Sequence, residues 1–390
     1  MIRPLTIFVA HPSDLLTDYL PHGDGLLAHA FIRRLAERGH TIEVAAPDVS
    51  LAEPLPPTVL VHRIRVRARG EMMRRIEYAT RVRRLFAERG GRNRFDLIHQ
   101  LNPVCTGLSL GLAGARVPVV LGPFVGHWPR DHGAPPIARW VLDGVAALQQ
   151  RLASSLLVTT PAALSRIPLA EAERHKVVML PYGIDTASFA PYDAAPHPPT
   201  ILFLAHVERR KGIGVLLDAF TRVAARVPGV RLIVAGASED DAVRARIAAS
   251  DDAERITYLG PVERGSVPEI VSRCDVYCLP SFGEPYGMTA IEAMACGKPI
   301  VATGAGGLGH LVEPEGGIAV PPGDAAALAD ALVEVLTDPV AREAMGRHNR
   351  RVAETRYEWE RVIDRLEEVY RSVASSMPSP SGALAEANSA

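Results

Sequence analysis

The chain has 390 residues, of which 47% are hydrophobic and 22% are charged, and its formal net charge is −1. This length accommodates two or three domains with cores of their own. A net charge near zero argues against a nucleic-acid partner. No stretch approaches the ~20 consecutive apolar residues that span a bilayer, and the first residues lack the pattern of a signal peptide. The four cysteines form no Cys-x-x-Cys pair, which favours reduced thiols in a cytoplasmic protein.

Short apolar runs alternate with helix-like segments along the chain. In the first half these runs are Leu5–Ala10, Thr41–Ala46, Val59–Val66, Asp96–Leu101, Val117–Leu121, Leu156–Thr159 and Val177–Leu180. In the second half they are Thr200–Leu204, Arg231–Ala235, Arg255–Leu259, Asp275–Leu279, Pro299–Thr303 and Gly317–Val320. Most runs are continuously apolar, as in strands covered by helices on both faces. The order therefore predicts an α/β fold with parallel sheets.

A proline-rich segment divides this series into two parts of similar length. Residues 189–199 include APYDAAPHPP, which can continue neither a helix nor a central strand. We therefore predict two doubly wound, Rossmann-like domains, residues 1–188 and 200–357, joined by this linker. Ligands of such sheets bind at the carboxyl ends of the strands, so two facing domains would place the site in a cleft. The tail 376–390 has few apolar residues and is predicted to be disordered.

The most informative segment is Ser281–Thr303, SFGEPYGMTAIEAMACGKPIVAT. A glycine-containing loop follows a strand, and a helix is predicted from about Met288. The free N–H groups and the dipole at a helix start suit a phosphate. A carboxylate accepts hydrogen bonds in pairs, so Glu284 and Glu292 can each hold neighbouring hydroxyls of a sugar or ribose. An ordinary surface helix would explain Glu292 alone, but it explains less well the coincidence of glycines, helix start and both acids.

This segment resembles the Glu-x7-Glu signature of the family 4 (group 1) retaining glycosyltransferases, which have the GT-B fold. The resemblance extends to Leu202–Phe220, Gly316–Asp324 and Tyr357–Tyr370, and it is looser in the first half. It implies two Rossmann-like domains facing each other across a cleft. It also implies that a C-terminal helix, at about 358–374, crosses back onto the N-terminal domain.

The resemblance also assigns roles to residues of the second domain. Glu284 would contact the transferred sugar, Glu292 the ribose, and Lys211 the leaving diphosphate, whose developing negative charge a fixed cation stabilises. The backbone around the helix start would face the sugar and phosphates, through Tyr286, Gly287, Met288 and Thr289.

Two positions depart from the family pattern. The family usually has an arginine where this chain has His206, and many relatives have a glutamate where it has His310. Either Arg209 or Arg210 can supply the missing charge. Otherwise diphosphate binding is weakened or becomes pH-sensitive through His206.

In the first domain, Gly23, Asp24 and Gly25 form a predicted loop before a helix, where glycines let backbone approach a ligand closely. The resemblance places this loop against the donor phosphates and the acceptor. For Asp24 a plain strand–helix turn is an equal alternative. Two further candidates on this side of the cleft are His99 and Asn102, although a histidine at a strand end is more often part of the core. His127 is a candidate catalytic residue, displaced from the position where some relatives carry a histidine.

Other signals point elsewhere. The run Gly304–Gly309 is formally Gly-x-Gly-x-x-Gly, but its place deep in the second domain and the lack of a following strand ending in an acid argue against NAD. No Asp-x-Asp motif or zinc spacing occurs, so we predict no metal and no cofactor besides a UDP- or GDP-sugar co-substrate.

Arginines are concentrated between Arg63 and Arg94. Those from Arg63 to Arg69 alternate with apolar residues, which predicts a strand with one basic face. A solvated domain edge and an anionic partner, either a phospholipid surface or a lipid-pyrophosphate acceptor, explain the region equally well. The second explanation would bring the protein to the inner face of the membrane as a peripheral protein.

These observations predict a metal-independent, retaining glycosyltransferase of the hexosyltransferase type. It would move a sugar from a nucleoside-diphosphate sugar to a saccharide or lipid-linked acceptor in cell-envelope polysaccharide or glycolipid synthesis. The alternatives on the same fold are a sugar-nucleotide epimerase, a phosphorylase, or a non-catalytic relative that binds sugar nucleotides.

Overall fold

The computed structural model describes residues 3–13, 15–20, 23–101, 111–112, 114–125, 136–167, 169–192, 197–238, 241–250 and 252–375. The chain forms two compact units, one of Met1–Tyr182 with Val362–Ala390 and the other of Gly183–Arg361. The predicted linker 189–199 therefore lies within the second unit. The C-terminal helix α11 (Trp359–Ser375) begins in the second unit and continues in the first from Val362 onward.

In the described part of the first unit, the central sheet has seven strands in the order β5-β3-β1-β6-β7-β8-β9. All of their pairings are parallel. The strands are β1 (Thr6–Ala10), β3 (Thr41–Ala46), β5 (Val59–Arg63), β6 (Leu97–Gln100), β7 (Val119–Phe124), β8 (Ser155–Val158) and β9 (Val177–Met179). Their inner residues are buried from both sides, which explains why the sequence runs are continuously apolar.

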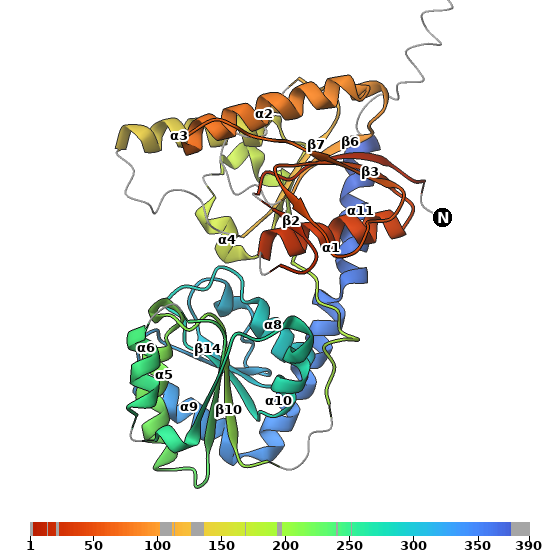
Figure 1. Cartoon of the computed structure of the whole chain (residues 1–390). Helices are drawn as coiled ribbons and strands as arrows, with labels where there is room; N and C mark the ends of the chain where they lie inside the picture. The colour runs from red at the N-terminus through yellow and green to blue at the C-terminus, as the bar shows by residue number, and fades with distance from the viewer. Residues whose placement is uncertain are drawn as a thin grey trace, which may run out of the picture. The chain divides into compact units, whose positions relative to one another are not determined.

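Helices cover both faces of this sheet. Figure 1 shows α2 (Glu71–Glu88) and α3 (Pro136–Leu152) on one side and α1 (Gly23–Glu37) and α11 on the other. A short helix α4 (Pro161–Arg166) follows β8, and its N-cap Thr160 accepts a hydrogen bond from the N–H of Ala163. The core under α2 includes Phe8, Phe86 and Phe95, whose rings pack against one another.

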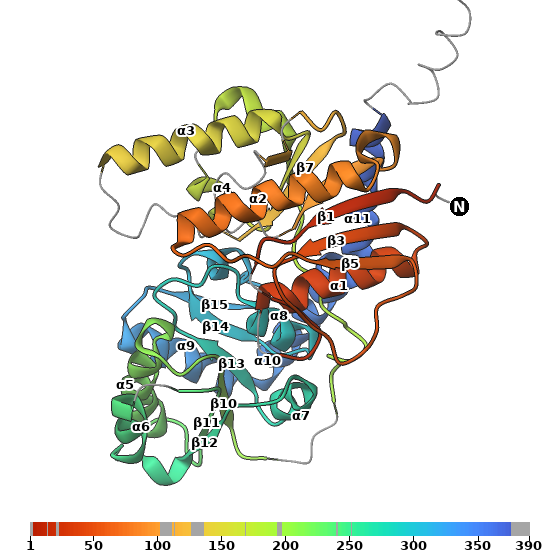
Figure 2. The ribbon, with the colours of Figure 1, turned by 45° about the horizontal axis from the view of Figure 1, so that its top comes forward.

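The second unit repeats the plan with a six-stranded sheet, counted over its described residues, in the order β12-β11-β10-β13-β14-β15. These strands are β10 (Thr200–Leu204), β11 (Arg231–Ala235), β12 (Ile256–Gly260), β13 (Val276–Leu279), β14 (Ile300–Thr303) and β15 (Gly317–Val320). Its helices are α5 (Ile213–Ala224), α6 (Asp241–Ala248), α7 (Val267–Ser272), α8 (Met288–Ala295), α9 (Ala325–Thr337) and α10 (Pro339–Val352). In Figure 2, α5 and α9 lie on one side of the sheet and α8 and α10 on the other.

Every apolar run predicted as a strand coincides with a strand of one of the two sheets, so the predicted α/β class is confirmed. The strand predicted through Arg63–Arg69 is wrong beyond Arg63. Strand β5 lies at the sheet edge, and its only neighbour, β3, ends at Ala46, which pairs with Arg63. Within the described part of the sheet, the residues after Arg63 therefore have no strand to pair with. Nothing in the sequence indicated the two-residue pair β2 (Leu16–Thr17) and β4 (Val49–Ser50).

No helix among the described residues is long and apolar enough to cross a membrane.

Candidate donor site at the carboxyl edge of the second sheet

The topology of the second sheet singles out the edge where β10 and β13 lie side by side. From β10 the chain continues to β11 on one side, whereas β13 and the later strands lie on the other. Ligands of doubly wound sheets bind at such a reversal, outside the carboxyl ends of the strands. The loops that leave β10 and β13 here carry the predicted residues Lys211 and Glu284.

These two loops are joined to each other by hydrogen bonds. The carbonyl oxygen of Arg210 accepts from the N–H of Phe282 at 2.9 Å and from Ser281 Oγ at 3.2 Å. In return, Arg210 Nη1 donates to the carbonyl oxygen of Gly283 at 3.1 Å. The two segments are thereby held in a fixed relation although they are far apart in the sequence.

Gly212 makes this close approach possible. Its φ is +77°, and a Cβ there would lie 1.9 Å from the carbonyl oxygen of Pro280. Only glycine adopts this left-handed conformation without strain, and only glycine leaves room for the Pro280 carbonyl.

We therefore expect Gly212→Ala to lower kcat/KM at least about tenfold, because the neighbouring Lys211 and the Pro280 loop must move apart. Gly229→Ala is the matched control: Gly229 has a φ of +73° but nothing within 4 Å of its Cβ position. Both variants carry the strain of a left-handed alanine, about 1–2 kcal/mol. Steady-state kinetics and thermal melting of the pair separate backbone strain from loop displacement, and equal kinetic losses in both would contradict this role for Gly212.

Lys211 and Glu284 form an ion pair, with side chains only 13% and 11% exposed. Lys211 ends the short turn Arg209–Lys211, and Glu284 lies in the loop after β13. The structure thus brings together the two predicted catalytic residues of the second unit. Both side chains have little access to water. The cation can bind a phosphate, and the carboxylate can accept hydrogen bonds from sugar hydroxyls.

The loop of Glu284 rests on the glycine run 304–309. The N–H of Gly307 donates to the carbonyl oxygen of Glu284 at 2.7 Å, and Glu284 forms a β-bridge with Gly306. A Cβ at Gly306 would lie 2.5 Å from the Glu284 carbonyl oxygen, and one at Gly307 equally close to that of Pro285. The formal dinucleotide motif therefore supports the Glu284 loop by close backbone packing.

Helix α8 begins at Met288, as predicted, with Gly287 at its N-cap and a φ of +97°. Tyr286 is buried, while Met288 and Thr289 are partly exposed. Thr289 Oγ1 lies 2.7 Å from the hydroxyl of Tyr277, so its side chain is held beneath the helix start. The first N–H groups of a helix have no partner within it and suit an anion.

Glu292 lies on the second turn of α8 and is only 5% exposed. Burial raises the pKa of this carboxyl to about 7, and the nearby charge of Arg264 opposes the rise. Arg264 Nη2 is 3.3 Å from Glu292 Oε1. Sequence reasoning missed Arg264, because no linear pattern connects it with Glu292.

The remaining predicted donor residues line the loop after β10. His206, Arg209 and Arg210 are exposed. Arg210 Nη2 pairs with Glu208 at 2.7 Å, so part of its charge is already neutralised. Of the two arginines considered as substitutes for the usual one, Arg209 is therefore the better candidate.

In the first unit, Gly23, Asp24 and Gly25 form the first turn of α1 and not a loop before it. An acid in a first turn is stabilised by the helix dipole. His99 is fully buried: its Nδ1 lies 2.5 Å from the Tyr370 hydroxyl and its Nε2 3.0 Å from the Gly122 carbonyl oxygen. Burial lowers its pKa to about 4. His99 is therefore a neutral core residue, and the acceptor-side role predicted for it is corrected. Asn102 and His127 lie outside the described residues.

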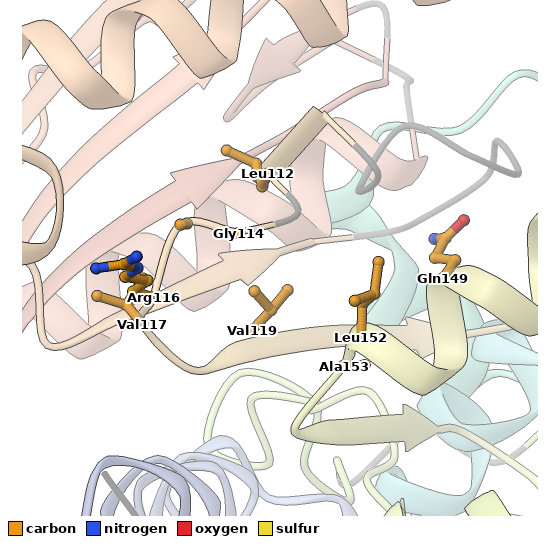
Figure 3. A pocket seen from close by; sticks show the side chains of 9 residues that line it. Leu112, Gly114, Arg116, Val117, Val119, Gln149, Leu152 and Ala153 are labelled. Atoms are coloured by element: carbon orange, nitrogen blue, oxygen red, sulfur yellow. The ribbon is translucent and has the colours of Figure 1, made fainter. Parts of the chain in front are cut away.

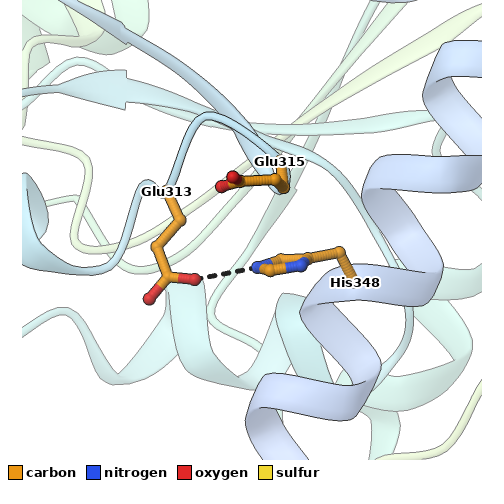
Figure 4. Close-up of side chains that lie close together, drawn as sticks. All are labelled: Glu313, Glu315 and His348. Atoms are coloured by element: carbon orange, nitrogen blue, oxygen red, sulfur yellow. Dashed lines mark hydrogen bonds and ion pairs between the residues drawn. The ribbon is translucent and has the colours of Figure 1, made fainter.

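A pocket and a group of residues with metal-ligand spacing lie outside this site. A pocket beside the start of β7 is lined by Arg116, Val119 and Leu152, among others (Figure 3). It lies at the amino end of β7, opposite the edge where such sheets bind ligands. Glu313, Glu315 and His348 are the one group with metal-ligand spacing among the described residues (Figure 4). Glu313 is already paired with His348 at 2.9 Å and with Arg356, so two of the three residues belong to an ion-pair network.

Comparisons with known proteins agree with this geometry. Residues 185–352 match the model of the group 1 glycosyl transferases, and residues 25–183 match the glycosyl transferase 4-like domain. The phosphatidyl-myo-inositol mannosyltransferase of Mycobacterium leprae is 32% identical over 380 residues, which cover 90% of this chain and 94% of that protein. The D-inositol 3-phosphate glycosyltransferase of Pseudarthrobacter chlorophenolicus is 26% identical over 89% of this chain and 90% of its own length.

Solved structures show the same fold. Sucrose-phosphate synthase from Thermosynechococcus elongatus superposes with a TM-score of 0.76 at 22% identity, over 95% of this chain and 99% of its own. The Anabaena protein HepE, solved with UDP, gives 0.74 at 19% identity, over 94% and 100%. The fold and site thus define a glycosyltransferase of the GT-B type. The chain belongs to the group 1 glycosyltransferases, family 4, and the comparisons give no support to the epimerase, phosphorylase and non-catalytic alternatives.

Proposed function

We propose that this protein transfers a hexose, with retention of configuration and without a metal ion, from a nucleoside-diphosphate sugar to a membrane lipid, so that the product is a glycolipid. The observation that carries the proposal is the Lys211–Glu284 pair beside the start of α8, with Glu292 one helical turn further along. This arrangement offers a cation and N–H groups to a diphosphate and two carboxylates to hydroxyls.

The arrangement favours a front-face mechanism. As the glycosidic bond to the nucleotide breaks, negative charge moves onto the phosphate, and Lys211 and the first N–H groups of α8 stabilise it. The acceptor's hydroxyl oxygen then attacks the face of the sugar from which the phosphate departs. The departing phosphate oxygen takes the proton of that hydroxyl. Within the described residues the site supplies leaving-group stabilisation through Lys211, and the sequence has no Asp-x-Asp motif for a metal-bound diphosphate.

The names of the relatives support a lipid-linked acceptor and mannose as the sugar. The M. leprae relative is a phosphatidyl-myo-inositol mannosyltransferase, and a 28% identical protein of Corynebacterium glutamicum is a GDP-mannose-dependent mannosyltransferase that acts on a monoacylated phosphatidylinositol monomannoside. We therefore propose GDP-mannose as the donor to test first and an inositol-containing phospholipid as the acceptor.

Contact with the membrane is part of this proposal, and the basic region of the first unit supports it. Several of its arginines are committed to ion pairs: Arg89 and Arg94 with the buried Glu43, and Arg81 and Arg84 with acids one turn away on α2. Arg65, Arg67 and Arg69 are exposed, and so are Met73 and Ile76 on α2, at 56% and 51%. Arginines beside exposed apolar side chains suit an anionic lipid surface.

The test is a screen of GDP-mannose, UDP-glucose and ADP-glucose with phosphatidylinositol in vesicles and with soluble oligosaccharides, read by mass spectrometry. We expect a mannosylated lipid as the main product. Transfer to oligosaccharides alone would contradict the lipid acceptor, and donor turnover without any acceptor would contradict transfer itself.

The stereochemistry of the product tests the mechanism. We expect an α-linked product from the α-linked donor, visible in the NMR signal of the anomeric proton. A β-linked product would require a general base opposite the leaving group and would overturn the front-face mechanism. Loss of activity in EDTA that Mn²⁺ restores would overturn metal independence alone.

A further inference from the structure

Arg264 is the charged partner that the structure provides for the buried carboxylate Glu292. It begins the short turn Arg264–Ser266 that precedes α7, and its side chain is 56% exposed, against 6% for that of Glu292. One end of the pair therefore reaches solvent while the other lies inside the protein. Glu292 comes from the second turn of α8, so two separate elements meet at this contact.

The guanidinium of Arg264 is also placed by a second contact. It lies over the ring of Phe189, 5.5 Å from the ring centroid, and Phe189 is only 4% exposed. The carbonyl oxygen of Phe189 accepts from Arg350 Nη1 at 2.8 Å, and the same nitrogen donates to the carbonyl oxygen of Ala295 at the end of α8. Arg264 thus rests on a ring that is tied to the helix carrying Glu292.

Of the other titratable groups around Glu292, Tyr277 and Cys296 stay neutral near pH 7. Burial raises the pKa of Tyr277 on β13 well above its usual value and that of Cys296, at the end of α8, to about 12. Arg350 of α10 and Lys298 act on Cys296, and Glu269 of α7 is paired with Arg273. Among the described groups, Arg264 is therefore the cation whose charge acts on Glu292.

We propose that Arg264 is a positioning residue for donor binding: it favours the ionised form of Glu292, which can accept hydrogen bonds from both ribose hydroxyls of the sugar nucleotide. This inference rests on the proposed function, in which Glu292 binds the donor ribose. An ionised carboxylate only accepts hydrogen bonds, whereas a protonated one must donate its own, so the charged form fits a pair of hydroxyls better.

The direction in which the loss of Arg264 shifts the pKa of Glu292 follows from the surroundings of this carboxyl. Burial disfavours the charged form of Glu292, and a positive charge 3.3 Å away favours it. Removing that charge leaves only the burial, so the carboxyl titrates at higher pH. Donor affinity should then fall at neutral and acidic pH and recover in alkaline solution, where Glu292 is ionised with or without Arg264.

The experiment measures binding of GDP-mannose, with UDP-glucose in parallel, by isothermal titration from pH 6.5 to pH 9. Sugar nucleotides serve as probes because their phosphates do not titrate in this range. We expect Arg264→Gln to weaken binding about five- to tenfold at pH 6.5, from a shift of about one pH unit, and less than about twofold at pH 9. Titrations in buffers of different ionisation enthalpy should show more protons released on binding at pH 7 by the variant than by the wild type.

Two further variants serve as controls for Arg264→Gln. Arg273→Gln removes an arginine that is 61% exposed and paired with Glu269, and it should leave the pH profile unchanged. In a protein that already carries Glu292→Gln, adding Arg264→Gln should no longer change the pH dependence of donor binding. An equal loss for Arg264→Gln at pH 6.5 and pH 9 would mean direct contact with the donor and would overturn the inference. Absence of donor binding by the wild type at every pH would overturn the proposed function itself.

Discussion

Lys211→Ala should lower kcat about 100- to 1000-fold, because it removes the fixed cation placed to neutralise the leaving diphosphate. The structure pairs Lys211 with Glu284 in a setting where both side chains are nearly buried. A charge that is already in place needs no reorganisation when the glycosidic bond breaks, so its effect is largest in the transition state. We expect KM for the donor to change much less than kcat.

The measurement is steady-state and single-turnover kinetics on purified protein, with two companions. Lys211→Arg keeps the charge and should retain more activity than Lys211→Ala, although its geometry differs. Glu284→Gln keeps the shape of the carboxylate and should also lower kcat. Because Lys211→Ala leaves a carboxylate that is 9% exposed without its cation, thermal melting must show that the variant is folded. A folded variant with near-normal kcat would contradict this role.

The two sheets could be predicted because their strands are covered on both faces. Burial from two sides demands continuous apolar runs, and these are visible in a single sequence, as in Thr200–Leu204 and Arg231–Ala235. The strand prediction failed where a segment needs a neighbouring strand with which to form hydrogen bonds. The alternating arginines after Arg63 look like a strand, but β3 has ended and no partner remains. Alternation alone does not reveal where the neighbouring strand stops.

The donor site could be predicted in part, because one loop carries Glu284, the glycine before the helix and Glu292 in a short span. The contacts that shape this loop connect residues distant in the chain. Lys211 and Glu284 are 73 residues apart, and the resemblance to a family, not the residue pattern, connected them. Arg264 and the packing of Gly306 against Glu284 had no such signal, since both depend on how the loops fold back on one another.

His99 shows how a sequence pattern can suggest a site residue that the structure places in the core. A histidine at the carboxyl end of a strand has the same sequence appearance whether its ring faces a ligand or the core. The structure decides this through Tyr370, on a helix 271 residues further along the chain, which faces one ring nitrogen. The same helix, α11, makes a second buried contact within the first unit.

That contact is made by Glu367, which is 2% exposed. Its Oε1 accepts from His40 Nε2 at 3.0 Å, and its Oε2 accepts from Arg38 Nη1 at 3.2 Å. The N–H of Leu5 donates to His40 Nδ1 at 3.1 Å, so Nδ1 is an acceptor and the ring proton lies on Nε2, facing Glu367. The carboxylate therefore connects α11 with the turn after α1 and, through His40, with the residue just before β1.

Glu367→Ala should destabilise the first unit by about 1–3 kcal/mol, because it leaves the Nε2–H of the buried His40 without its acceptor. Arg38 keeps its second ion pair, with Asp364. Glu368→Ala is the matched control: it is the next residue on the same helix, its side chain is 52% exposed, and its pair with Arg365 lies on the surface. That change should cost less than about 1 kcal/mol. Because a chain of two units need not unfold in one step, hydrogen exchange of peptides from α11 and β1 reports the effect more directly than a melting temperature. Faster exchange in both peptides for Glu367→Ala, but not for Glu368→Ala, is the expected result. Equal protection in the two variants would mean that apolar residues such as Ile363 and Leu366, both fully buried, hold α11 in place without the ion pair.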